Sequence, residues 1–190
     1  MEHIQIKPLT PRRAEDFFTF FEQVAFADHP EWGCDCFCCF FHAISREAWE
    51  TATREANRLA ARRMIEQGQM RGLLAYAGET PVGWCHFDRL ANLPGAPVFY
   101  PELASKDGES AAIVCFTVAQ GWRGQGIAAA LLKKALEDLK ASGVKRVEAY
   151  PVLNDDSQEH NYLGPMRLYE SAGFVQVKQT EHHALVEKTL

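Results

Sequence analysis

Three glycines, Gly121, Gly124 and Gly126, lie within six residues between an apolar run and an amphipathic segment. Glycine lowers the stability of helices and strands by roughly 0.5–1 kcal/mol relative to alanine, so this cluster indicates a loop that some group must approach closely. The first turn of the helix that follows offers backbone N–H groups without intrahelical partners, and they carry about half a positive charge. The segment therefore predicts a site for a phosphate or pyrophosphate, with Arg123 as a further cation.

Two other phosphate-binding patterns compete for this loop. A P-loop ends in Gly-Lys-Ser/Thr, whereas residues 126–128 are Gly-Ile-Ala. A dinucleotide fingerprint is matched by Gly124-x-Gly126-x-x-Ala129, and Glu148 stands where its ribose-binding carboxylate belongs. Only about 40 residues follow Glu148, too few for the rest of a doubly wound sheet. A plain strand-to-helix turn with packing glycines is the alternative without a ligand.

The elements that must position the loop alternate between strands and helices. Residues 111–119 form a continuous apolar run typical of a buried strand, and the apolar stripe from Ile127 to Leu139 predicts a helix ending near Gly143. Further strands are expected at residues 4–6, on both sides of the 78–81 turn, and at 144–152, 173–177 and 184–188, and further helices at 11–24, 45–67 and 165–171. The sequence thus predicts one α/β domain over residues 1–190, with mixed strand directions.

Composition and charge exclude several classes of protein. The chain has 190 residues, of which 47% are hydrophobic and 24% charged, as in globular domains. Its net charge of −5 argues against a nucleic-acid partner, which would call for clustered Lys and Arg. No apolar run approaches the ~20 residues that cross a bilayer, and the N-terminal residues lack the apolar core of a signal peptide. The six cysteines fit reduced thiols, so we expect a cytoplasmic protein without a membrane partner.

The loop and a second segment resemble the GCN5-related N-acetyltransferase (GNAT) superfamily. Arg123-x-x-Gly126-x-Ala128 after a buried strand is similar to the family's Arg/Gln-x-x-Gly-x-Gly/Ala signature, which holds the pyrophosphate of acetyl-coenzyme A. Residues 168–174, LYESAGF, resemble the family's LYEKxGF segment, and the order of the predicted elements is the family's over nearly the whole chain. The resemblance implies a mixed, mostly antiparallel central sheet, flanked by helices and splayed where the cofactor binds.

The resemblance also implies which residues bind acetyl-coenzyme A. The pantetheine arm would lie along the strand at Phe116, Thr117 and Val118. The pyrophosphate would meet the backbone of the loop and the start of the helix, at Arg123, Gly124, Gln125, Gly126, Ile127 and Ala128. The family's Asn-x-x-Ala before the LYE segment is replaced here by residues 162–165, Tyr-Leu-Gly-Pro. Asn161 is displaced by one position, so Asn154 becomes the candidate for the asparagine contact to the cofactor.

Acetyl transfer to an amine sets three chemical requirements. The amine must lose a proton, the developing oxyanion needs a donor, and the departing thiolate needs an acid. A backbone N–H near Val118 can serve the oxyanion. Tyr169 matches the family's tyrosine that protonates the leaving sulfur, and the alternative is a core aromatic residue. Glu148 is the leading candidate for the general base, with His86 and Asp88 as alternatives, and water chains could replace a base altogether.

A cysteine-rich segment near the N-terminus contains Cys34, Cys36, Cys38 and Cys39. Its Cys-x-Cys-x-Cys-Cys spacing differs from the Cys-x₂₋₄-Cys pairs of structural zinc sites, so we expect no metal and a packing role for these thiols. A similar Trp-x-x-Cys-x-Cys stretch characterises a subgroup of the family, where it covers the acceptor side. This resemblance implies an acceptor pocket shaped by Trp32, Phe37, Phe40, His42 and Trp84, with His86 as a further substrate-binding candidate.

The predicted function is direct transfer of the acetyl group to a primary amine of a small molecule or peptide in a ternary complex. The acidic net charge is compatible with cationic acceptors such as polyamines. A coenzyme A-binding sensor or interaction module without turnover is the non-enzyme alternative, and a cysteine-based metal or redox protein is the third. Family members are often dimers, so the resemblance allows a homodimer.

Overall fold

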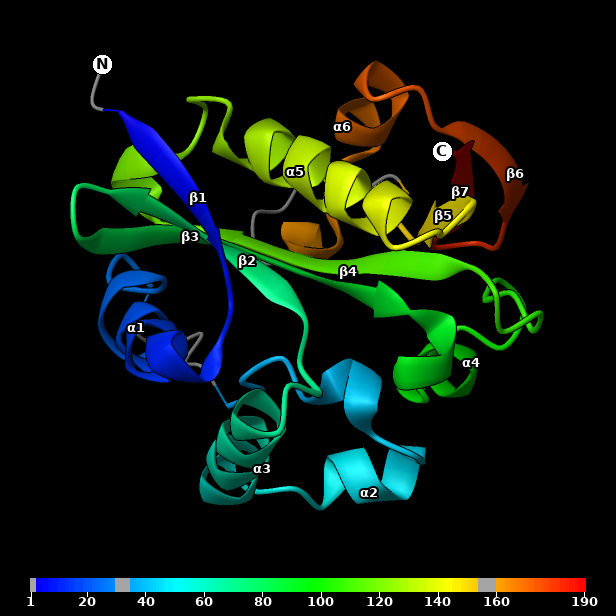
Figure 1. Ribbon diagram of the computed structural model, residues 1–190. Helices are drawn as coiled ribbons and strands as arrows, with labels where there is room; N and C mark the ends of the chain where they lie inside the picture. The colour runs from blue at the N-terminus through cyan, green and yellow to red at the C-terminus, as the bar shows by residue number, and fades with distance from the viewer. Residues whose placement is uncertain (1–2, 30–34, 154–159) are drawn as a thin grey trace.

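The computed structural model describes residues 3–29, 35–153 and 160–190, which build one seven-stranded sheet with helices on both faces (Figure 1). The strands are β1 (Ile4–Pro8), β2 (Gly72–Ala77), β3 (Thr80–Arg89), β4 (Ala111–Val118), β5 (Arg146–Ala149), β6 (Val175–Gln179) and β7 (Ala184–Thr189). Their order is β1-β2-β3-β4-β5-β7-β6. The β4–β5 pair is parallel and the other neighbouring pairs are antiparallel, which confirms the predicted mixed sheet.

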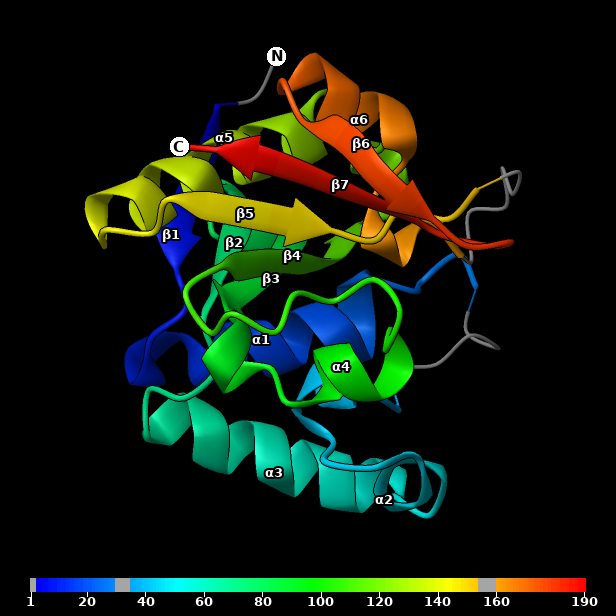
Figure 2. The same ribbon diagram turned by 90° about the vertical axis from the view of Figure 1, so that its right-hand side faces the viewer.

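Two layers of helices cover the sheet. On one face lie α5 (Ile127–Ala141) and α6 (Met166–Ser171). On the other lie α1 (Ala14–Thr19), α2 (Arg46–Glu50), α3 (Arg54–Glu66) and α4 (Gly95–Phe99) (Figures 1 and 2). Short 3₁₀ segments occupy Pro11–Arg13, Phe40–His42, Leu90–Asn92, Gln120–Trp122 and His160–Leu163, and α1 continues as a π-helix over Phe20–Val24. No helix in these described ranges is long and apolar enough to cross a membrane.

The helix α5 is held on the sheet by the apolar stripe that the sequence predicts. Ile127, Leu131, Leu132, Ala135 and Leu139 are all buried, and each large side chain contributes about 1.5–3 kcal/mol through burial. Gly83 on β3 allows the start of the helix to come close, because a Cβ there would lie 2.9 Å from Cγ2 of Ile127. The N-terminus of α5 is therefore fixed against β3, at the end of the glycine loop.

The sheet opens between β4 and β5. The parallel ladder joins Ala111–Ile113 to Val147–Ala149 and ends there, whereas β4 continues to Val118. From Val114 onward, the edge of β4 that faces β5 lies beyond this ladder. The predicted splay is thus confirmed, and it lies directly before the glycine loop.

Several element boundaries differ from the predictions. The helix expected over residues 45–67 is two helices, because Ser45 caps α2 by accepting from the Ala48 N–H and Thr53 caps α3 by accepting from the Ala56 N–H, each at 3.1 Å. The strand expected at 144–152 ends at Ala149, and Val152 forms only an isolated bridge with His183. The strand expected at 173–177 is β6, which begins two residues later and runs to Gln179.

Candidate functional site

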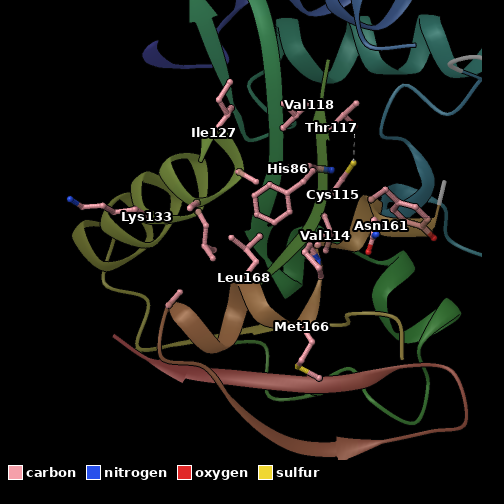
Figure 3. Close-up of a pocket in the computed structure, with 18 of the residues that line it drawn as sticks. His86, Val114, Cys115, Thr117, Val118, Ile127, Lys133, Asn161, Met166 and Leu168 are labelled. Atoms are coloured by element: carbon pink, nitrogen blue, oxygen red, sulfur yellow. Dashed lines mark hydrogen bonds between the residues drawn. The ribbon is translucent and has the colours of Figure 1, made fainter. Parts of the chain in front are cut away.

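A cavity of about 1910 Å³ lies along the gap between β4 and β5 (Figure 3). Its walls are Val114–Val118 of β4, the glycine loop with the start of α5, the segment from Asn161 to α6, and part of the cysteine-rich segment. Ligand pockets usually measure about 300–1,000 Å³, so this cavity has room for two ligands side by side.

The glycine loop presents bare backbone N–H groups to the cavity. Gly124 and Gly126 have φ angles of +72° and +81°, which favour glycine, and a Cβ at either position would meet no atom within 4 Å. Gly126 is the N-cap of α5 and the cap has no side-chain hydrogen bond. The first bond inside the helix runs from the Ala130 N–H to the Gly126 carbonyl, so the N–H groups of residues 127–129 have no intrahelical partner. The loop and helix start therefore form an open cradle that suits a pyrophosphate.

Charged side chains also line the cavity along α5 and the elements beside it. Lys133, Glu137 and Lys140 come from α5, Arg167 from α6 and Lys188 from β7. Cations outnumber the acidic group in this list, which suits an anionic ligand.

Arg123 lines the cavity, and its side chain is held by contacts within the protein. Its Nε donates to the Val118 carbonyl at 2.9 Å, and one terminal nitrogen donates to Oδ2 of Asp28 at 2.9 Å. The Asp28 side chain is only 5% exposed, so the guanidinium charge is compensated inside the protein. Arg123 thereby ties the loop to the end of β4, and its backbone is the part that adjoins the cradle.

We expect Arg123→Gln to weaken the fold more than it weakens cofactor binding. The substitution leaves the buried Asp28 carboxylate without its charged donor, and the free energy of unfolding should fall by about 1–3 kcal/mol in urea denaturation. Adding Asp28→Asn should recover part of this loss, since no unpaired charge is then buried. A phosphate-binding Arg123 would instead show a large loss of cofactor affinity that Asp28→Asn does not restore.

The strand residues predicted to meet the pantetheine arm all line the cavity. Phe116, Thr117 and Val118 form its wall on β4, beyond the end of the β5 ladder (Figure 3). Gly124, Gly126, Ile127 and Ala128 line it from the loop and helix, whereas the exposed Gln125 side chain folds back to the Gly121 carbonyl at 2.8 Å. Asn154 lies outside the described residues. Asn161 lines the cavity. In the sequence, its position one residue from the asparagine of the family motif was the feature that could have identified it.

Tyr169 lies immediately behind the cavity wall. It is fully buried, and its hydroxyl donates to the Leu163 carbonyl at 2.5 Å. A Cβ on Gly164, which lines the cavity, would lie 3.0 Å from this hydroxyl. Gly164 thus packs against the phenol and also lines the cavity, whereas Tyr169 is not part of the described lining. Burial raises the pKa of Tyr169 well above its usual range, so the phenol keeps its proton.

Glu148 is placed away from the cavity. It is fully buried on β5, where Oε1 accepts from the Ser105 N–H at 3.1 Å and from the Tyr150 hydroxyl. Burial raises the pKa of this carboxyl, and the hydrogen bonds from Ser105 and Tyr150 oppose the shift. The segment after α4 seals Glu148 on that face of the sheet, so it is absent from the described lining of the cavity. The predicted role as general base has no support in this geometry.

The predicted acceptor residues divide into two groups. His86 lines the cavity, but Phe37 and Trp84 are fully buried in the core beneath α1. Trp84 packs edge-on against Phe17, and its Nε1–H donates to Cys38 Sγ at 3.0 Å. Placing Phe37 and Trp84 on the acceptor wall was therefore wrong, because α1 and the cysteine-rich segment cover them. Trp32 and Cys34 lie outside the described residues.

Other aromatic residues take the place of those two. The described aromatic lining of the cavity includes Phe21, Phe26, Phe40, Phe41, Trp49, Trp122 and Tyr162. Phe40 stacks on Phe99 of α4, with ring centroids 3.9 Å apart, and packs edge-on against Trp49 of α2. Helices far apart in sequence thus assemble this part of the lining. Of these residues only Phe40 was predicted for the acceptor pocket, and the predicted His42 contacts His86 from outside the described lining.

The cysteines behave mainly as small packing residues. Cys38 and Cys39 are 4% and 6% exposed in the core beneath α1. Burial raises the pKa of Cys39 to about 12, so this thiol is unreactive. Among the described residues, no three His, Cys, Asp or Glu side chains are grouped so that they could hold a metal ion.

Comparisons with known proteins agree with this geometry. A model of the Acetyltransferase (GNAT) family matches residues 37–174. The GNAT domain of PAT from S. lividans superposes with a TM-score of 0.63 at 18% identity, over 98% of this chain and 90% of that one. PaiA N-acetyltransferase from Thermoplasma acidophilum, solved in complex with coenzyme A, gives a TM-score of 0.58 at 16% identity, over 99% of both chains. A search of curated proteins finds no match.

The fold is that of the acetyltransferases found in these comparisons. Because the family model spans well over half of the chain, the protein belongs to the acetyltransferase (GNAT) family. The dinucleotide interpretation of the glycine loop is thereby excluded, since that fingerprint belongs to a doubly wound parallel sheet and this sheet is mostly antiparallel.

Proposed function

We propose that this protein transfers an acetyl group from acetyl-coenzyme A directly to a primary amine of a small molecule or peptide. The observation that carries the proposal is the cradle at Gly124 and Gly126, which continues into the open edge of β4. The loop would hold the pyrophosphate, and Phe116–Val118 would hold the pantetheine arm in the gap beside β5. Acetyl-coenzyme A, when bound, supplies an activated thioester carbonyl at the inner end of that gap.

The residues around the inner end can serve two of the three chemical requirements. A backbone N–H of the unpaired β4 edge can stabilise the developing oxyanion. Tyr169 holds a proton next to Gly164 of the cavity lining and would donate it to the departing sulfur in place of its bond to the Leu163 carbonyl.

The described acceptor wall supports an amine carried on an apolar body. Phe40, Phe41 and Trp49 offer rings to pack against, and burying a second ammonium among them would be costly. We therefore expect arylalkylamines or peptides with an apolar first residue to be better acceptors than polyamines.

The first test is a thermal shift with acetyl-coenzyme A. A ligand at about 100 times its dissociation constant stabilises the fold by about 2.7 kcal/mol, so a clear rise in melting temperature is expected. NAD, NADP and ATP serve as controls and should shift the melting temperature far less. An acetyl-transfer assay over an amine panel, corrected for thioester hydrolysis, then separates an enzyme from a coenzyme A-binding sensor, which would bind without transferring.

A further inference from the structure

His86 is a buried histidine on β3 that lines the cavity next to its register partner on β4, Cys115 (Figure 3). Its Nδ1 has no hydrogen-bond partner among the described residues. Its Nε2 lies 3.3 Å from Nε2 of His42, and the two rings stack with centroids 5.1 Å apart. A buried polar atom without a partner costs about 1–3 kcal/mol, so Nδ1 of His86 calls for a partner that arrives with a ligand.

The backbone contact of His42 determines which ring nitrogens of His42 and His86 carry a proton. The backbone of Asn92 raises the pKa of the His42 ring, as a carbonyl that accepts from this ring would. Because Nε2 of His42 faces His86, Nδ1 is the nitrogen that donates to Asn92, and neutral His42 presents a bare Nε2. His86 must then donate from its own Nε2, which leaves a lone pair on its Nδ1.

Both rings are neutral near pH 7. Burial, together with the neighbouring His42, holds the pKa of His86 well below its usual range. Burial also lowers the pKa of His42, although the Asp88 carboxylate and the bond to Asn92 oppose this shift. A positive charge on the pair is therefore better tolerated on His42, which faces Asp88, than on His86.

We propose that His86 is the general base of the acetyl transfer and that His42 is the positioning residue that fixes its tautomer. The inference rests on the proposed function. As the amine nitrogen bonds to the carbonyl carbon, its proton moves to Nδ1 of His86. The Nε2 proton of His86 moves to Nε2 of His42, so the charge ends beside Asp88 and the Asn92 carbonyl. No oxidant or further reactant is needed.

A weak base is sufficient for this step. A free alkylammonium is a poor acid, but the amine nitrogen becomes positively charged and far more acidic as the new C–N bond forms. The acceptor thus enters as the neutral amine, and His86 has to remove only the proton that bond formation releases. The apolar surroundings of His86 keep it unprotonated and ready at neutral pH.

The other titratable groups near the pair are Asp88 and the thiols Cys38 and Cys115. Burial, followed by hydrogen bonds with Cys115 and Cys36, raises the pKa of Cys38 well above its usual range, so this thiol does not titrate near neutral pH. We therefore assign the fall of kcat at acidic pH to protonation of the pair formed by His42 and His86.

The first test uses the ligand-free protein and needs no substitution. Long-range ¹H–¹⁵N spectra near neutral pH should show His42 protonated at Nδ1 and His86 protonated at Nε2 with a bare Nδ1. A neutral His86 that carries its proton on Nδ1 would overturn the proposal, since Nδ1 would then have no lone pair to accept the amine proton.

The second test is kinetic. His86→Gln should lower kcat by about 100-fold or more while the thermal shift with acetyl-coenzyme A is unchanged. His42→Phe should cost less, and it should move the acid limb of kcat to higher pH because the neighbour that lowers the pKa of His86 is gone. His183→Gln is the matched control, because His183 is a partly buried histidine outside the described cavity lining, and it should behave as wild type.

The outcomes separate the two proposals. An active wild type whose His86 and His42 variants keep its kcat and pH profile overturns the role of His86 alone. A wild type that binds acetyl-coenzyme A but acetylates no amine overturns the proposed function and the general-base role with it. If His86→Gln does not fold, the tautomer spectra and the His42 variant still decide the question.

Discussion

Tyr169→Phe is expected to slow acetyl transfer by about 10²–10⁴-fold, the usual contribution of a positioned proton donor. The phenol keeps its proton because burial raises its pKa, and its hydroxyl packs against Gly164, which lines the cavity. The substitution also removes the bond to the Leu163 carbonyl, which should lower the free energy of unfolding by about 1–3 kcal/mol. The measurement is kcat at saturating acetyl-coenzyme A, at a temperature where both proteins are folded.

Tyr76→Phe is the matched control for that experiment. Tyr76 is likewise buried, and its hydroxyl donates to Oδ2 of Asp16 at 2.7 Å, on the opposite face of the sheet from Tyr169. Its loss should reduce stability without changing kcat. A Tyr169 variant that is destabilised like the Tyr76 variant but turns over at the wild-type rate would make Tyr169 a core residue only.

Gly126→Asp should abolish the thermal shift with acetyl-coenzyme A. Two like charges about 4 Å apart repel by roughly 4 kcal/mol at a protein surface, equivalent to about a 1,000-fold loss of affinity. The protein itself should remain folded, because a Cβ at residue 126 meets no atom within 4 Å and aspartate tolerates a positive φ better than most residues. The measurements are melting temperatures with and without acetyl-coenzyme A.

Two controls isolate the charge in this experiment. Gly126→Asn has nearly the same shape without the charge and should keep much more of the affinity. Gly68→Asp places the same residue at a φ of +68° near the end of α3, also with no atom within 4 Å of its Cβ. It should retain the full shift. If the Asp and Asn variants of residue 126 lost affinity for acetyl-coenzyme A equally, the added side-chain volume at residue 126, and not its charge, would be the cause.

The cofactor half of the site could be predicted from the sequence because its determinants are local. Gly124 and Gly126 need their positive φ angles for reasons contained in the loop, and the stripe from Ile127 to Leu139 specifies its own buried face. The break between α2 and α3 was also local, since Ser45 and Thr53 are both strong N-cap types, but a single long helix was predicted over them.

The acceptor half depended on contacts between distant segments. Trp84 and His86 share one face of β3, yet the first is sealed under α1 and the second reaches the cavity. Glu148 lies on a strand beside the gap, but the segment around Ser105 covers it. The contact between His42 and His86 joins residues 44 positions apart, and no periodicity in the chain signals it.

The gap between β4 and β5 also affects how readily the protein without bound ligand could associate with other copies of itself. An unpaired strand edge is a template on which another polypeptide can add, and proteins normally shield such edges. Here the bare stretch of β4 starts at the inner end of a three-residue ladder, between two strands of the same sheet and not at its rim. Along this stretch the cavity is closed in by the start of α5 and the segment from Asn161 to α6. We therefore expect the edge to accept a thin extended ligand that enters the cavity and to be shielded from a full strand of another molecule.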